Sequence, residues 1–207
     1  MGENKLTEFK LMQVLDWSYE KAVNGLPGME TAEELANKYI SKSSSIDDAI
    51  DQFISWQQAK CATSGFITGL GGIITLPVSV PANISSVIYI QTRMIATIAN
   101  MRGYDLKDDQ VRTLVYVSLT GQSAADILKQ SGIKIGTNVA KSLVKKIPGE
   151  VIKNINQKVG FRLLTKFGQT GVINLGKCIP LVGGVIGGTV DAIGTRTIGK
   201  TAKKVFC

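Results

Sequence analysis

Apolar side chains recur at helical spacing along nearly the whole chain. The first repeat covers residues 6–25, and the tetrapeptides that begin at Thr31 and Ser45 are typical of capped helix starts; the first, T-A-E-E, is a capping box. No alternating stretch with a hairpin turn competes with this pattern, so we predict an all-α fold. Further helical segments are predicted at 82–101, 108–119, 122–130, 133–147, 149–167, 170–178 and 181–206.

A run of 32 residues, from Cys61 to Thr92, contains no charged side chain. This exceeds the length of about 20 apolar residues that crosses a bilayer as a helix. Pro77 and Pro81 interrupt the run, however, and leave a segment rich in Gly, Ser and Thr before the next helix. We therefore expect core helices, or a re-entrant or interfacial hairpin, rather than a transmembrane span.

Small residues form two stripes at helical spacing. The first contains Gly65, Gly69 and Gly72, and the second follows Pro180. Because glycine inside a helix costs up to about 1 kcal/mol relative to alanine, such stripes usually permit two backbones to approach closely. We predict that these two helices pack on each other, in a single compact domain with Gly-rich, closely packed apolar central helices. The second stripe consists of Gly184, Gly188, Asp191, Thr195, Gly199 and Ala202.

Four polar side chains in these apolar segments are candidates for burial. Gln91 lies among isoleucines and needs hydrogen-bond partners if it is buried. Arg93 shares a helical face with Tyr89, and an exposed polar side of that helix accounts for both. Asp191, beside Thr195 on the second stripe, requires a cation such as Arg93 or several donors. A structural ion pair is the favoured interpretation, and a catalytic acid is the alternative.

The composition excludes several kinds of catalytic site. The chain has no histidine, which excludes a Ser-His-Asp triad, a Cys-His dyad, an HExxH zinc site and a His-ligated haem. Its three cysteines are an odd number without a CxxC spacing, so neither a disulfide framework nor a zinc site is indicated. We expect reduced thiols in a cytoplasm, no cofactor and no metal. Asp191 remains as a weak catalytic candidate.

Charge divides the chain into three parts. Residues 1–60 carry 10 acidic and 6 basic side chains, residues 61–128 carry 4 of each, and residues 129–207 carry 2 acidic and 14 basic ones. The basic last part favours contact with phosphates of lipid or nucleic acid, with a solvated cationic surface as the alternative. Nucleic acid is disfavoured because this part holds only three aromatic residues and no recognition motif.

The segment 133–147 predicts a basic amphipathic helix. Its lysines Lys134, Lys141 and Lys145 point to one side, and Val139 and Leu143 are among the apolar residues on the other. Such a helix can lie on an anionic bilayer, where each cation contributes about 1 kcal/mol. The alternative is that its apolar face packs on the core of the domain.

Two motifs match known patterns only in part. The string Gly194–Thr201 has the letters of a Walker A motif, but it lies in sequence that reads as helix and follows no predicted strand, so we expect no nucleotide. The stretch from Gly121 to Ala125 approximates a nucleophile elbow around Ser123, yet it lacks the second glycine and a histidine partner. A Ser-Lys arrangement is neither excluded nor supported.

Two blocks of the chain resemble the bacterial EcsC family. The first is SGFITGLGGIITLPVSVP at 64–81, followed by a helix and R-G-Y-D at 102–105, and the second is the tail at 177–206. The resemblance covers roughly residues 45–207, and Ser79 departs from it because members often have Asp there. It agrees with a helical, membrane-associating protein and carries over no established mechanism, although some members are labelled as hydrolases. The structural motif residues are Gly65, Gly69, Gly71, Gly72, Pro77, Pro81, Gly184 and Gly188.

The sequence therefore predicts an acidic helical segment over 1–44 and an EcsC-like helical domain over 45–207. We expect a cytoplasmic protein, peripherally associated with membranes, that binds an anionic lipid surface through Lys134, Lys141 and Lys145. A membrane transporter or another protein is the expected alternative partner. Two further functions stay open: a membrane-inserting or pore-forming effector, and a hydrolase that uses Asp191 with hydroxyl side chains.

Overall fold

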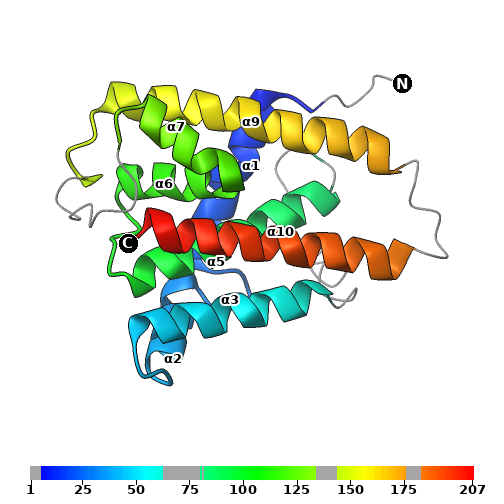
Figure 1. Ribbon diagram of the computed structural model, residues 1–207. Helices are drawn as coiled ribbons and strands as arrows, with labels where there is room; N and C mark the ends of the chain where they lie inside the picture. Colours follow the sequence, from blue (N-terminus) through cyan, green and yellow to red (C-terminus); the bar gives the residue numbers. More distant parts are fainter. Residues whose placement is uncertain (1–5, 63–79, 81, 134–143, 176–182) are drawn as a thin grey trace.

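A computed structural model describes residues 6–62, 80, 82–133, 144–175 and 183–207 (Figure 1). For residues 60–62, 82, 83, 168–175 and 183–193 it describes the backbone alone. The described chain contains helices and turns, with one isolated β-bridge between Leu26 and Met29. The predicted all-α fold is confirmed.

Eight α-helices and one 3-10 helix make up the described part of the chain. Their order begins with α1 (Glu8–Asn24), α2 (Ala32–Ile40), α3 (Ile46–Ala62) and α5 (Ala82–Met101). It continues with α6 (Asp109–Leu119), η1 (Gly121–Ser123), α7 (Ala124–Gln130), α9 (Gly149–Leu175) and α10 (Gly183–Val205).

Helix boundaries follow the sequence signals where a capping residue sets them. Thr31 accepts a hydrogen bond from the backbone N–H of Glu34, whose carboxylate accepts one from the N–H of Thr31, so the predicted capping box is present. The hydroxyl of Ser45 accepts from the N–H of Asp48 before α3. The first predicted helix and the segment 82–101 also match α1 and α5 closely.

The predicted break between segments 149–167 and 170–178 is wrong. One helix, α9, continues from Gly149 to Leu175. Gly168 and Gly171 lower its helix propensity by about 1 kcal/mol each, but glycine keeps its backbone N–H and the helical ladder continues through it. A proline would have removed that donor.

Helix α5 is the centre of the fold. It contacts α1, α2, α3, α6 and α10, and Figure 1 shows α9 along one edge of the molecule with α2 and α3 along the opposite edge. Ile88, Tyr89, Ile95 and Ile98 of α5 are completely buried. The helix therefore has apolar residues on most of its circumference, in agreement with a sequence in which Arg93 is the one charged residue.

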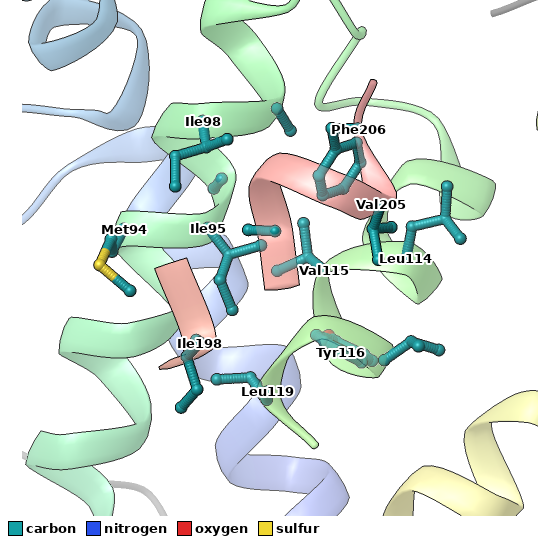
Figure 2. Packing of buried hydrophobic residues seen from close by; sticks show 14 of the residues in the cluster. Met94, Ile95, Ile98, Leu114, Val115, Tyr116, Leu119, Ile198, Val205 and Phe206 are labelled. Atoms are coloured by element: carbon teal, nitrogen blue, oxygen red, sulfur yellow. The ribbon is translucent and has the colours of Figure 1, made fainter. Parts of the chain in front are cut away.

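The C-terminal end of α10 completes the core between α5 and α6. Figure 2 shows this cluster. Complete burial of a Val, Leu, Ile, Phe or Met side chain contributes about 1.5–3 kcal/mol to stability. Phe206 is entirely buried, and its ring stacks edge to face on Tyr104 at 5.1 Å between centroids. The labelled members are Met94, Ile95, Ile98, Leu114, Val115, Tyr116, Leu119, Ile198, Val205 and Phe206.

Candidate functional site

The structure places only one of the three lysines predicted to bind anions. Lys145 is exposed, and its Nζ lies 3.3 Å from Asp108 Oδ2. Lys134 and Lys141 lie outside the described residues. The predicted amphipathic helix over 133–147 therefore stays a prediction.

Most of the glycines and prolines of the sequence motif also lie outside the described residues: Gly65, Gly69, Gly71, Gly72, Pro77 and Pro81. Gly184, Gly188 and Asp191 belong to α10, for which this stretch is described by its backbone alone. The predicted contact between the two small-residue stripes stays untested. So does the role of the Asp191 carboxylate.

The remaining polar candidates are held in the core or at its edge. Gln91 and Thr195 are buried, and Gln91 Oε1 has no hydrogen-bond partner among the described residues. Arg93 is half-buried, and its Nε donates to the carbonyl oxygen of Glu30 at 2.9 Å. Its Nη2 donates to the same oxygen, and burial lowers the pKa of the guanidinium.

The expectation that Arg93 lies on an exposed polar side of its helix is wrong. Tyr89, on the same face, is completely buried, and its ring lies 5.8 Å from that of Trp17. The loop between α1 and α2 covers this side of α5 and supplies the carbonyl of Glu30 to the guanidinium. Arg93 therefore has a structural role: it satisfies a loop carbonyl beside the core.

The outer surface of α9 carries a feature that the sequence analysis did not single out. Phe161 of α9 is 64% exposed, and Phe9 of α1 is 71% exposed. The residues next to them touch, because a Cβ at Gly160 would lie 2.7 Å from Glu8 Cγ. Each phenylalanine is therefore the chain neighbour of a residue in the contact between α1 and α9.

Lysines border Phe161 on both sides. At 100° per residue, Lys153 lies about 80° to one side of Phe161 around the helix axis and Lys158 about 60° to the other. No ion pair joins either lysine to another residue in the described part of the chain. This region of α9 and α1 is called the phenylalanine surface below.

A cavity of about 410 Å³ lies between η1, α9 and α10. Its lining includes the hydroxyl-bearing side chains of Thr120, Ser123, Thr165 and Thr197 and the cations Arg162 and Lys166. A second cavity of about 380 Å³ shares Gly121, Gln122 and Thr197 with the first and adds Lys200 and Lys204. None of the described residues that line either cavity is acidic.

The wall shared by the two cavities depends on one glycine. Helix α6 ends at Thr120, whose Oγ1 donates to the carbonyl of Val117 at 2.7 Å. Gly121 then adopts a φ of 63°, in the left-handed region that side chains disfavour. This turns the chain into η1 and brings Gln122 and Ser123 to the cavity.

Lys166 is fixed at the edge of this cavity. Its Nζ donates to the carbonyl of Leu119 at 3.4 Å and lies 5.3 Å from the centroid of the Phe167 ring. The side chain as a whole is exposed, yet burial of the ammonium by neighbouring atoms lowers its pKa. Arg162 stands one helical turn earlier, so two like charges face the same cavity at a spacing where they repel.

A comparison with models of protein families shows the family to which this chain belongs. The model of the EcsC protein family matches residues 5–207. The chain belongs to the EcsC protein family. The match includes α1 and α2, which precede the region where the sequence resemblance was visible. Searches of curated proteins and of solved structures gave no match.

Two further findings bear on what this EcsC protein can do. Within the described helices, none is long and apolar enough to cross a membrane. Among the described side chains, no three of Cys, Asp or Glu gather where they could hold a metal ion. The side chains that the structure does show at the candidate site are cations and hydroxyls at the cavity and exposed aromatic rings on α1 and α9.

The EcsC chain brings together residues that sequence analysis had treated separately. Ser123, from the incomplete nucleophile elbow, and Gly194 and Thr197, from the Walker-like string, line the same cavity as Lys166. The string itself lies within α10, so it does not form the loop of a phosphate-binding Walker motif. Gly121, two residues before Ser123, was the one local sequence signal of the turn that brings Ser123 to the cavity.

Proposed function

We propose that this EcsC-family protein binds anionic membranes peripherally, with its phenylalanine surface against the lipid headgroups. The observation that carries the proposal is the exposed ring of Phe161 between Lys153 and Lys158. An interfacial helix combines these two elements, an apolar side chain that enters the headgroup region and cations that meet phosphates.

The energies involved are sufficient for reversible attachment. Each lysine near an anionic surface contributes about 1 kcal/mol, and burying a phenylalanine side chain contributes about 1.5–3 kcal/mol. Phe161 and Phe9 together with Lys153 and Lys158 therefore supply several kcal/mol. Attachment of this kind weakens as salt increases, because salt screens the lysines.

The distribution of ion pairs also supports the choice of α9. Carboxylates of α3 neutralise the end of α10: Lys203 Nζ lies 3.0 Å from Asp47 and 2.8 Å from Asp51. Helix α9, by contrast, contains a single acidic residue, Glu150, in its first turn. The acidic N-terminal part of the chain thus covers part of the basic C-terminal third and leaves the lysines of α9 available.

Sedimentation with vesicles tests the proposal. The full chain is expected to sediment with vesicles of phosphatidylcholine and phosphatidylglycerol in equal parts, and to stay in solution with phosphatidylcholine alone. The variant with Lys153→Glu and Lys158→Glu, and the variant Phe161→Ser, are expected to lose most of this binding. The combination of Lys42→Glu and Lys107→Glu, at exposed lysines in the loops after α2 and after α5, makes the same charge change away from the surface and serves as control.

Two results would remove the proposal. One is no sedimentation of the unchanged chain with the anionic vesicles at low salt. The other is equal loss in the control with Lys42→Glu and Lys107→Glu and in the double α9 variant, because net charge alone would then explain binding.

The two rival functions from the sequence depend on segments that the structure describes only in part. A membrane-inserting hairpin would use residues 61–92, and release of a dye from the same vesicles would separate it from surface binding. A hydrolase would use the Asp191 carboxylate, and a panel of esterase, lipase and phosphatase substrates with Asp191→Ala would test it. Equal activity of the two proteins would remove that function.

A further inference from the structure

We infer that the cavity between η1, α9 and α10 binds one phosphate group, with Arg162 and Lys166 as its cations and Ser123 and Gln122 as neutral donors. This goes beyond attachment to a charged surface. A membrane surface attracts any cation near it, whereas this cavity would distinguish a phosphate ester from other anions of equal charge. The inference does not require the phenylalanine surface to bind lipid.

The charge of the cavity is the first support. Arg162 and Lys166 line it from successive turns of α9, and none of its described lining residues is acidic. Two cations at this spacing repel each other, and an anion between them converts the repulsion into two attractions. Arg162 forms no ion pair with a described residue.

An account of the hydroxyl donors is the second support. Thr120 donates its hydroxyl hydrogen to Val117 O, and Thr165 donates its own to Phe161 O at 3.0 Å. The hydroxyl oxygens of Thr120 and Thr165 can therefore only accept further hydrogen bonds. The hydroxyl of Ser123 makes no hydrogen bond to another described residue, so its hydrogen is available to an acceptor. Gln122 is exposed beside it and carries an amide donor.

The size of the cavity indicates a phosphate ester rather than a bare ion. Its volume of about 410 Å³ lies within the range of small-ligand pockets, about 300–1,000 Å³. A phosphate group occupies a fraction of that space. The adjoining cavity with Lys200 and Lys204 keeps the potential positive on the other side of the Gly121–Ser123 turn.

Calorimetric titration of the full chain with sn-glycerol 3-phosphate at constant ionic strength tests the inference. We expect saturable binding that chloride at the same ionic strength does not reproduce. Lys166→Gln and Ser123→Ala are each expected to weaken it about tenfold or more, as the loss of a hydrogen bond to a charged group does. Lys42→Gln removes the same charge from an exposed lysine that lines neither cavity, so it is the matched control and is expected to bind normally.

A steric variant separates the cavity from general electrostatics. Gly194 lines the cavity, and a Cβ at this position meets nothing within 4 Å. Gly194→Met therefore occupies the space without removing a charge, and it is expected to abolish binding of glycerol phosphate while the far-ultraviolet circular dichroism stays unchanged. Unchanged binding in a folded Gly194→Met protein would overturn the inference.

Vesicles identify the source of the phosphate. Preference for phosphatidic acid over phosphatidylglycerol at equal surface charge, lost in Gly194→Met, indicates a lipid headgroup. Binding of glycerol phosphate with no such preference indicates a soluble ester. No saturable binding of either ligand overturns the inference, and Phe161→Ser distinguishes this failure from that of membrane attachment, because it leaves the cavity intact.

Discussion

Gly199 of α10 lies directly against Ile54 of α3, so closely that a Cβ on Gly199 would fall 2.8 Å from Ile54 Cγ1. The same Cβ would lie 3.0 Å from Cγ2 and 3.1 Å from Cδ1. Isoleucine is stiff at χ1, so it cannot easily move aside. We predict that Gly199→Ala destabilises the protein by about 1–3 kcal/mol, as overpacked cores do, measured by urea unfolding.

Gly194, five residues earlier on the same helix, gives the opposite prediction. A Cβ there meets nothing within 4 Å, so Gly194→Ala removes the helix penalty of glycine without a clash. The free energy of unfolding is expected to rise by about 0.5–1 kcal/mol. Equal effects of the two substitutions would show that helix propensity, and not the contact with Ile54, sets the outcome.

The turn at Gly121 is expected to tolerate no side chain without cost. Its φ of 63° is strained for every residue that has a Cβ, by about 1–2 kcal/mol. Gly121→Ala should lower the unfolding free energy by about that amount. Gly149→Ala, at the start of α9, meets nothing within 4 Å at an ordinary φ and is the matched control.

Stability is expected to fall as pH rises above about 10. Burial raises the pKa of Tyr19 and of Tyr116 far above the ordinary value, because the ionised ring would lose its hydration. In the unfolded chain both titrate near pH 10, so above that pH the unfolded state binds fewer protons than the folded state. Each tyrosine then reduces stability by about 1.4 kcal/mol per pH unit.

Phenylalanine substitutions check this slope. Tyr116 donates to Asp16 Oδ1 at 2.7 Å and Tyr19 to Leu106 O at 2.8 Å, so each variant also loses about 1 kcal/mol at neutral pH. Unfolding in urea between pH 8 and pH 11 should show a shallower decline in Tyr19→Phe and in Tyr116→Phe than in the unchanged chain. An unchanged slope in both variants would contradict the assignment.

The ion pairs of Asp47 are expected to contribute little. Hydrogen bonds from Arg102 and Lys203 lower the pKa of its carboxyl, so their contribution is present above the unfolded pKa, near 4, and is lost as pH falls through the folded value. Because the carboxylate is exposed, Asp47→Asn should cost at most about 1 kcal/mol. The difference between the two proteins should shrink with added salt, which unfolding at low and high ionic strength measures.

Much of this fold follows from local sequence signals. The T-A-E-E box and the apolar helical repeat over 82–101 predicted where α2 begins and where α5 lies, because capping and helix periodicity act over a few residues. The exposure of Arg93 was predicted wrongly because a helical wheel does not show which other segments cover each face of a helix. The loop that supplies the Glu30 carbonyl is 63 residues away in the chain.

The candidate site could be foreseen only in fragments. Ser123 and Thr197 each attracted attention through motifs that do not apply, and Arg162 and Lys166 belong to a helix whose lysines follow no strict pattern. Their meeting depends on the turn at Gly121 and on the packing of α9 and of α10 against α6, which brings together residues more than thirty positions apart. Local periodicity carries no information about such contacts.

The burial of Phe206 against Tyr104 has a consequence for biosynthesis. Helices α3, α5 and α6 leave the ribosome well before α10, whose C-terminal end fills the space between α5 and α6. Until that helix emerges, Met94, Ile95 and Val115 face a groove with no occupant. The nascent chain therefore carries exposed apolar surface between the synthesis of α6 and that of α10, which is the condition under which chaperones hold a growing polypeptide.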